Sequence, residues 1–252
     1  MMCFDDTLER LALTFSVRDF MIAKDDLVCA SSDDIARIEL EKHPAFDVIP
    51  LIDKNGEISA YFERERNKRR SFRQGDIVSD STSILSLVSI LRSRKFCFVL
   101  AKDKIVGYIH FSDLNRGIVK LPYFLILEDL ECRLVERIGH EIHEDNLQAV
   151  LDPERIKQVK DRMQRMKDTR SELRWVNLLY FKEIVEFAIY FKIVQLEAAQ
   201  VEILAQIRNS ICHADRPLIE KHEDLRSLDE AGHICLSLIE SDACDGRLAH
   251  EA

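Results

Sequence analysis

The chain contains few of the residues that interrupt regular secondary structure. Its 252 residues include only 7 glycines and 5 prolines, a composition that favours long helices over a loop-rich β architecture. Hydrophobic residues make up 46% of the chain and charged residues 32%, which is typical of folded proteins with a buried core. The length fits one large domain or two of ordinary size.

The chain also lacks an excess of positive charge. The net charge of −9 argues against bulk electrostatic attachment to nucleic acid or to an anionic membrane, so any phosphate-binding surface must be local. One basic stretch, interrupted by a single acid, consists of Arg64, Arg66, Lys68, Arg69, Arg70 and Arg73. We interpret it as a solvated charged linker, with contact to a nucleotide or RNA phosphate as the alternative.

Several common sites and signals are missing. The seven cysteines are scattered without a C-x-x-C pair, which argues against a zinc site or a thiol-exchange motif. His140 and His143 stand three residues apart instead of the four of H-E-x-x-H, so no metal site is predicted. The N-terminus carries acids where a secretory signal needs positive charge. With no apolar run of about 18 residues, the sequence predicts a cytoplasmic protein with reduced thiols and no membrane partner.

The first 120 residues contain an internal repeat. Residues 46–53 and 58–62 are typical of two strands joined by the turn 54–56, and a helix is expected to begin near Asp33. The same order returns about fifty residues later, with a helix over 84–92 and strands over 96–100 and 105–109. Two such units are expected to pack together around a pseudo-twofold axis and to leave clefts between them.

From Leu121 onward the pattern becomes helical. Helices are predicted over residues 124–143, 154–170, 175–194, 198–212 and 231–240. The last twelve residues lack apolar periodicity. The chain is therefore predicted to be an α+β protein with a mixed α/β domain over residues 1–120, an all-α domain over 121–240 and a flexible tail over 241–252.

The repeat resembles tandem CBS motifs. Residues 17–21 match the opening of such a motif and residues 46–50 its first strand, while Gly107-Tyr108-Ile109-His110-Phe111-Ser112-Asp113 resembles the family pattern G-x-x-T-x-x-D. The resemblance implies a regulatory adenine nucleotide (AMP, ADP, ATP or a related compound), with Asp113 accepting hydrogen bonds from the ribose hydroxyls. The implied nucleotide-binding residues are Asp113, His110, Val48, Pro50 and Gly107. An N-cap role is the alternative for Asp113.

Two departures from this pattern change what is expected. His110 replaces a threonine whose hydroxyl helps to hold phosphate, so the phosphate contact is open and could depend on pH. In the first repeat, Ala60 and Glu63 stand at the glycine and threonine positions, and Arg66 stands where the ribose-binding aspartate would be. That first site is predicted to be inactive towards a conventional nucleotide, or altered.

A short motif in the second half resembles the HEPN superfamily of helical domains, which includes many ribonucleases. The motif is Arg208-Asn209-x3-His213, at the end of an apolar helix. An imidazole can take and return protons during cleavage at a ribose 2′-hydroxyl, and a guanidinium can stabilise the charge that develops on phosphorus. Residues five apart on a helix point about 140° away from each other, so Arg208 and His213 need a helix end or a second subunit to converge.

These patterns predict an adenine-nucleotide-regulated, metal-independent HEPN endoribonuclease that acts as a homodimer in toxin, defence or stress functions. Its catalytic residues would be Arg208, Asn209 and His213, with no cofactor for catalysis, RNA as substrate and a possible antitoxin as partner. In the alternative interpretation Arg208 pairs with a local acid and His213 closes the helix. The protein would then be a non-catalytic nucleotide sensor whose helical domain binds a partner protein or RNA.

Overall fold

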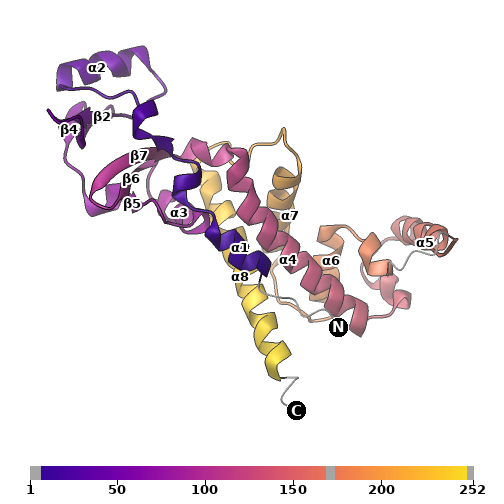
Figure 1. Cartoon of the computed structure of the whole chain (residues 1–252). Helices are drawn as coiled ribbons and strands as arrows, with labels where there is room; N and C mark the ends of the chain where they lie inside the picture. Colours follow the sequence, from indigo (N-terminus) through magenta and orange to yellow (C-terminus); the bar gives the residue numbers. More distant parts are fainter. Residues whose placement is uncertain (1–6, 169–173, 249–252) are drawn as a thin grey trace. The chain divides into compact units, whose positions relative to one another are not determined.

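The computed structural model describes residues 7–168 and 174–248, with side chains up to Ser241. It divides into two compact units (Figure 1). The sheet unit comprises Leu13–Val119 and Ile219–Arg226, and the helical unit comprises residues up to Ala12, Lys120–Leu218 and the residues from Ser227. Among the described residues, no helix combines the length and the apolar composition needed to cross a membrane.

The first repeat of the sheet unit forms a helix followed by a three-stranded sheet. Helix α2 (Asp33–Lys42) begins after Ser32, whose side chain accepts a hydrogen bond from the Ile35 backbone N–H. Strands β2 (Val48–Ile52), β3 (Ile58–Glu63) and β4 (Lys68–Arg70) then pair antiparallel in the order β2-β3-β4. The predicted turn between β2 and β3 is confirmed, with Gly56 at φ +76°.

The second repeat forms a four-stranded sheet. Strand β5 (Ile77–Ser79) and helix α3 (Ile84–Leu91) precede strands β6 (Phe96–Ala101) and β7 (Lys104–His110). The short strand β1 (Ile22–Ala23) pairs with β7 and completes the order β1-β7-β6-β5. Short 3-10 helices lie between these elements: η1 (Val17–Asp19), η2 (Lys24–Asp26), η3 (Gln74–Asp76) and η4 (Phe111–Asn115).

Strand pairing reveals the repeat directly. Ala30 forms a parallel bridge with Leu51, and Val78 pairs in parallel with Val99. In both cases the partner lies 21 residues further along the chain, across one helix, and the strand that carries it pairs antiparallel with the next strand. The predicted doubling of a helix–strand–strand unit in the first half of the chain is therefore present in the structure.

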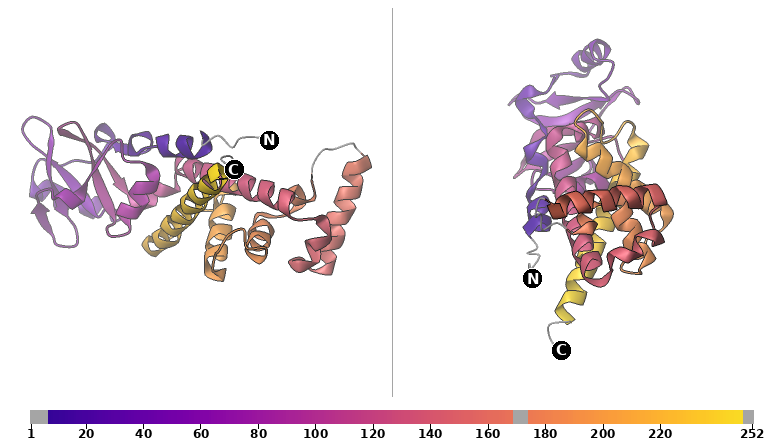
Figure 2. Two further views of the ribbon diagram at one scale, coloured as in Figure 1. Left: turned by 90° about the horizontal axis from the view of Figure 1, so that it is seen from below. Right: turned by 90° about the vertical axis from the view of Figure 1, so that its right-hand side faces the viewer.

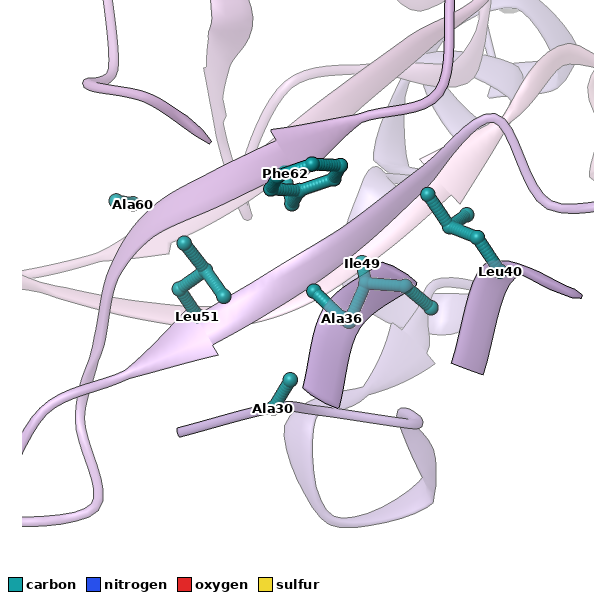
Figure 3. Close-up of a cluster of buried hydrophobic side chains, with 7 residues drawn as sticks. All are labelled: Ala30, Ala36, Leu40, Ile49, Leu51, Ala60 and Phe62. Carbon is teal, nitrogen blue, oxygen red and sulfur yellow. The ribbon is translucent and has the colours of Figure 1, made fainter. Parts of the chain in front are cut away.

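Strand β3 is buried on both faces because it lies between two hydrophobic layers. On one face, Figure 3 shows Ala60 and Phe62 with side chains of α2 and β2. On the other face, Ile58 and Tyr61 contact Phe98 and Ile105 of the second sheet. Burial, reinforced by the charge of Asp76, raises the pKa of Tyr61 to about 12. The two sheets are thus joined by an apolar and aromatic layer.

The basic stretch is not a linker, so that interpretation was wrong. Lys68–Arg70 forms strand β4, and the Arg64 guanidinium donates to the carbonyl oxygens of Phe46, Leu40 and His43 at the end of α2. Arg70 forms an ion pair with Glu63 at 3.0 Å. Part of the positive charge therefore stabilises the first sheet and its helix.

The helical unit contains long and short helices (Figures 1 and 2). Its helices are α1 (Thr7–Thr14), α4 (Gly117–Glu141), η5 (Glu144–Ala149), α5 (Pro153–Asp168), η6 (Trp175–Leu178), α6 (Phe181–Tyr190), α7 (Ala198–Cys212) and α8 (Leu225–Leu248). Helices α1, α4 and α8 each include a few residues that are assigned to the sheet unit. The short helix η7 (His222–Asp224) belongs to the sheet unit. The predicted bounds of α7 are confirmed, and α5 begins after Asp152, whose carboxylate accepts the Arg155 backbone N–H as expected of its cap.

Three helix predictions were wrong in extent. Helix α4 runs from Gly117 to Glu141, where residues 124–143 were predicted. Residues 175–194 do not form one helix, because Tyr180 is extended and its backbone N–H donates to the Glu183 carboxylate, which starts α6 anew. Lys192 at φ +61° follows the end of α6. The last helix, α8, runs from Leu225 to Leu248, not from 231 to 240, so helix occupies much of the segment predicted to be a tail. Residues 249–252 lie outside the described part of the chain.

A segment from late in the sequence belongs to the sheet unit. The Asn115 amide forms two hydrogen bonds with the backbone of Ile219, donating to its oxygen at 2.7 Å and accepting from its N–H at 3.0 Å. His222 Nε2 lies 2.8 Å from the carbonyl oxygen of Leu91 and 3.0 Å from that of Arg94. The sheet unit is therefore not one continuous stretch that ends at residue 120.

Candidate functional site

The sheet unit contains a pocket at the start of β2 and the end of β7. Its volume is about 280 Å³, near the lower end of the roughly 300–1,000 Å³ typical of small-molecule sites. Its apolar wall comes from Ile22, Leu27, Val28, Val48, Pro50 and Tyr108. Its polar groups are Asp26, Asp47, His110, Ser112 and Asp113. A mostly apolar pocket with a few polar groups is the usual form of a small-molecule site.

Four of the five predicted nucleotide-binding residues line this pocket: Asp113, His110, Val48 and Pro50. Gly107 is not among the lining residues. A Cβ atom there would lie 2.7 Å from the Ile22 backbone oxygen, so glycine allows β1 to approach β7 closely. The structure explains Gly107 by strand packing.

Asp113 does not act as the N-cap of the next helix. It is the third residue of η4, and its Oδ2 accepts the His110 backbone N–H at 2.8 Å. Its Oδ1 lies 3.3 Å from Arg116 Nη2, and the side chain is 14% exposed. A carboxylate has about four acceptor positions, so Asp113 is held in place and keeps capacity for a ligand's hydroxyl groups.

His110 uses both ring nitrogens within the pocket wall. Nδ1 lies 2.7 Å from Ser112 Oγ and 3.3 Å from the Ser112 backbone nitrogen, and Nε2 lies 3.1 Å from Asp47 Oδ2. This arrangement fits the neutral tautomer with hydrogen on Nε2. Burial lowers the pKa of His110, against an opposing effect of the Asp47 charge. His110 is thus a neutral wall residue oriented by Asp47.

The sequence did not identify Asp47, Asp26 or Tyr108 as pocket residues. Asp47 belongs to the strand segment that matched the CBS pattern, but it contacts His110 across 63 positions of sequence. Tertiary folding alone brings these two side chains together. In the first repeat, Arg66 and Glu63 form an ion pair at 3.6 Å, and the predicted inactivity of that site stays a prediction.

The predicted catalytic residues lie at the exposed end of α7. Arg208 and Asn209 line a pocket of about 320 Å³ together with Ala205, Glu131 of α4 and residues 179–182 at the start of α6. Arg208 Nη2 lies 3.8 Å from Glu131 Oε2, which is an ion pair without a hydrogen bond. Burial raises the pKa of Glu131, and Arg208 opposes that rise.

His213 is exposed and does not line this pocket. It is the C-cap residue of α7, with its backbone N–H bonded to the Asn209 oxygen at 3.2 Å. Within residues 7–168 and 174–241, the side chains of Asn209 and His213 make no hydrogen bond. One copy of the chain therefore groups Arg208 with Asn209 but leaves His213 apart from their pocket.

Lys120 holds the end of α7. Its ammonium group donates to the backbone oxygens of Ser210 at 2.8 Å, His213 at 3.0 Å and Arg216 at 2.7 Å. A cation is favourable at a helix C-terminus, where the last carbonyl groups lack partners. The positive charge at the C-terminus of α7 therefore comes from Lys120, not from the His213 side chain that the alternative interpretation expected there.

Replacing Lys120 with methionine should loosen residues 210–216, because three carbonyl oxygens lose the ammonium group that donates to them. Hydrogen exchange of the amides in that segment is expected to become at least about tenfold faster. Lys157→Met, at an exposed position of α5, is the control and should leave the segment unchanged. Equal exchange rates in both variants would contradict the assigned role of Lys120.

The two histidines set aside as a metal site are engaged with nearby acids. His140 Nε2 lies 3.4 Å from Glu136 Oε1, and His143 Nδ1 lies 3.0 Å from Asp145 Oδ2. Among the described residues, no group of three or more His, Cys, Asp or Glu side chains could hold a metal ion.

Comparison with known proteins finds weak structural similarity to a few solved structures. No protein-family model matches the chain, and no curated protein matches it. Among solved structures, the chain is similar to the CBS domain of a bacterial CNNM/CorC-family Mg²⁺ transporter in complex with ATP, at 14% identity and a TM-score of 0.34 over 46% of this chain and 92% of that chain.

Two further structures give comparable values. A CBS domain from Clostridium difficile 630 matches at 17% identity and a TM-score of 0.34, over 43% of this chain and 97% of that one. An uncharacterized conserved protein from Pyrococcus horikoshii matches at 17% identity and a TM-score of 0.32, over 40% and 90%. TM-scores below 0.5 do not establish a shared fold, so the case for a ligand site rests on the repeat and the pocket themselves.

Proposed function

We propose that the sheet unit is a regulatory module that binds an adenosine compound, an adenine nucleotide or a relative of one, in the pocket formed by β2, β7 and η4. The observation that carries the proposal is the position of Asp113, a largely buried carboxylate beside an apolar slot. The slot suits a planar base, and the carboxylate suits two neighbouring ribose hydroxyls.

The test compares adenosine with 2′-deoxyadenosine on the full-length protein by calorimetric titration. Wild-type protein should bind adenosine at least about tenfold more tightly, since hydrogen bonds to a charged acceptor contribute roughly 1.5–3 kcal/mol each. In Asp113→Ala, the affinity for adenosine should fall to that for 2′-deoxyadenosine. Asp34→Asn, at an exposed position of α2, is the control and should keep the wild-type preference.

Equal affinity for adenosine and the deoxy compound in wild-type protein would contradict a contact between Asp113 and the ribose. An Asp113→Ala variant that keeps the preference would contradict it as well. Mass spectrometry of ligands released from freshly purified protein provides an independent check, because a bound adenosine compound should be recovered from wild-type protein in greater yield than from the variant.

A second function is proposed for the helical unit: metal-independent cleavage of RNA by Arg208, Asn209 and His213. The supporting observation is that these three residues lie at one exposed helix end and that Asn209 and His213 keep their side chains unbonded within the described chain. Since His213 does not line the pocket of Arg208, a second copy of the chain is proposed to supply it. The ligand of the sheet unit would regulate this activity.

The alternative is a non-catalytic module in which the same surface binds a partner protein or RNA. RNA incubated with the protein in EDTA separates the two possibilities. Cleavage that leaves a 2′,3′-cyclic phosphate supports the nuclease, because that product forms when the 2′-oxygen attacks phosphorus. Binding without cleavage supports the module.

A further inference from the structure

The charged residues that line the sheet-unit pocket are all acidic. Three carboxylates line it, those of Asp26, Asp47 and Asp113, and no Lys or Arg is present among the lining residues, all of which are described. A pocket of about 280 Å³ keeps any bound group within a few ångströms of these carboxylates. Like charges at such distances repel appreciably even at the effective dielectric of a protein surface.

Cations outside the lining compensate only part of this charge. Lys95 Nζ lies 4.0 Å from Asp47 Oδ1 with its side chain 61% exposed, and Arg116 Nη2 lies 3.3 Å from Asp113 Oδ1. Asp26 is exposed and has no side-chain hydrogen bond or ion pair with any residue that the structure describes. One carboxylate thus lines the pocket without an ion pair among the described residues.

His110 does not supply the missing positive charge. Its Nδ1 contacts the hydroxyl and the backbone N–H of Ser112, and its Nε2 is directed at Asp47, so both nitrogens are engaged within the protein. Burial lowers the pKa of His110, against the opposing charges of Asp47 and Asp113, which favours the neutral imidazole. The pocket therefore offers a phosphate no cationic donor from its own lining.

The carboxylates of the pocket do not belong to a group of side chains that could hold a divalent cation. Among the described residues, no group of three or more acidic, histidine or cysteine side chains is arranged to hold a metal ion. The carboxylates of the pocket are therefore separate negative charges around an apolar slot and not a preformed cradle for a metal-bound polyphosphate.

We propose that this pocket takes a nucleoside without phosphate groups, and that its carboxylates discriminate against nucleotides by charge. This inference rests on the proposed binding of an adenosine compound and narrows that function to one ligand class. Asp113 orients the ribose, the apolar wall holds the base, and Asp26 and Asp47 exclude an anionic 5′ substituent.

The experiment titrates the full-length protein with adenosine, AMP, ATP and ATP with Mg²⁺ at one ionic strength. Adenosine should bind at least about tenfold more tightly than AMP, and ATP should bind more weakly still. The difference between adenosine and AMP should shrink as salt is raised, because salt screens charges near the surface.

The double variant Asp26→Asn/Asp47→Asn tests the origin of the discrimination. It removes two negative charges but keeps side-chain shape, and the amide oxygen at position 47 can still accept the His110 N–H. AMP affinity should rise about tenfold relative to adenosine, whereas the exposed control Asp34→Asn should leave the ratio unchanged.

The outcomes separate this inference from the proposed function. If AMP or ATP binds wild-type protein as tightly as adenosine or more tightly, with or without Mg²⁺, the inference is overturned and the adenosine-binding function stands. An unchanged ratio in the double variant also overturns it. If none of the four compounds binds, the proposed function itself fails, and this inference fails with it.

Discussion

Replacing Arg133 with methionine is expected to lower the free energy of unfolding by about 3–5 kcal/mol. Arg133 Nε donates to Asp129 Oδ1 at 2.9 Å one turn away on α4, and the two side chains are 5% and 2% exposed. The Asp129 Oδ2 atom has no hydrogen-bond partner among the described residues. Without the guanidinium, a carboxylate would remain buried and uncompensated, which is strongly unfavourable. Urea unfolding followed by circular dichroism measures the loss.

Removing both charges should be far less damaging than removing one. In Asp129→Leu/Arg133→Met neither charge of this buried pair is left without its partner, so most of the lost stability is expected to return. Lys182→Met is the control, because Lys182 pairs with Glu202 on the exposed surface of the same unit and exposed pairs contribute little. A double variant as unstable as Arg133→Met would show that shape, not charge, dominates at this position.

Replacing His213 with alanine is expected to reduce RNA cleavage in EDTA by about 10²–10⁴-fold, the usual contribution of a positioned general acid or base. His213 is exposed at the end of α7 with its backbone held by Lys120, so the substitution should not disturb the fold. A change in the cleavage rate at unchanged thermal stability would therefore report on chemistry. The measurement is the initial rate of appearance of 2′,3′-cyclic phosphate ends.

Two variants make this test specific. His140→Ala removes another imidazole whose side chain is 70% exposed and should leave cleavage unchanged. Arg208→Lys keeps the charge but loses the fork of donors that a guanidinium presents to phosphate, so cleavage should fall while RNA binding persists. If wild-type protein does not cut RNA in EDTA, or if His140→Ala is as inactive as His213→Ala, the nuclease assignment is contradicted.

The sequence predicted local elements well where strong local signals exist. Helix α7 was placed correctly because its apolar residues recur at helical spacing, and the turn at Gly56 follows from the backbone freedom of glycine. Prediction failed where a tertiary contact decides the local structure. Tyr180 and Glu183 restart a helix inside an apolar run. Arg64 was interpreted as part of a linker, but it binds carbonyl oxygens at the end of α2 and stabilises the fold.

The residues of the candidate sites also fall into those that the sequence could identify and those that only the structure reveals. Asp113, His110, Val48 and Pro50 could be named from pattern alone and line one pocket. Asp47 and Asp26 could not be named, because their relevance depends on which strands and loops meet. Likewise, nothing in the local sequence indicates that Lys120 binds the end of α7, 90 positions further along.

By itself, the sequence determined the doubled helix–strand–strand pattern and the change to helices in the second half, since both are written in the spacing of apolar residues and in turn-forming residues. Only the tertiary structure decided the charge of the ligand pocket, the burial of the ion pair in α4 and the contacts of Lys120 with the end of α7. These features depend on burial and on distances between residues remote in sequence, which side-chain periodicity does not encode.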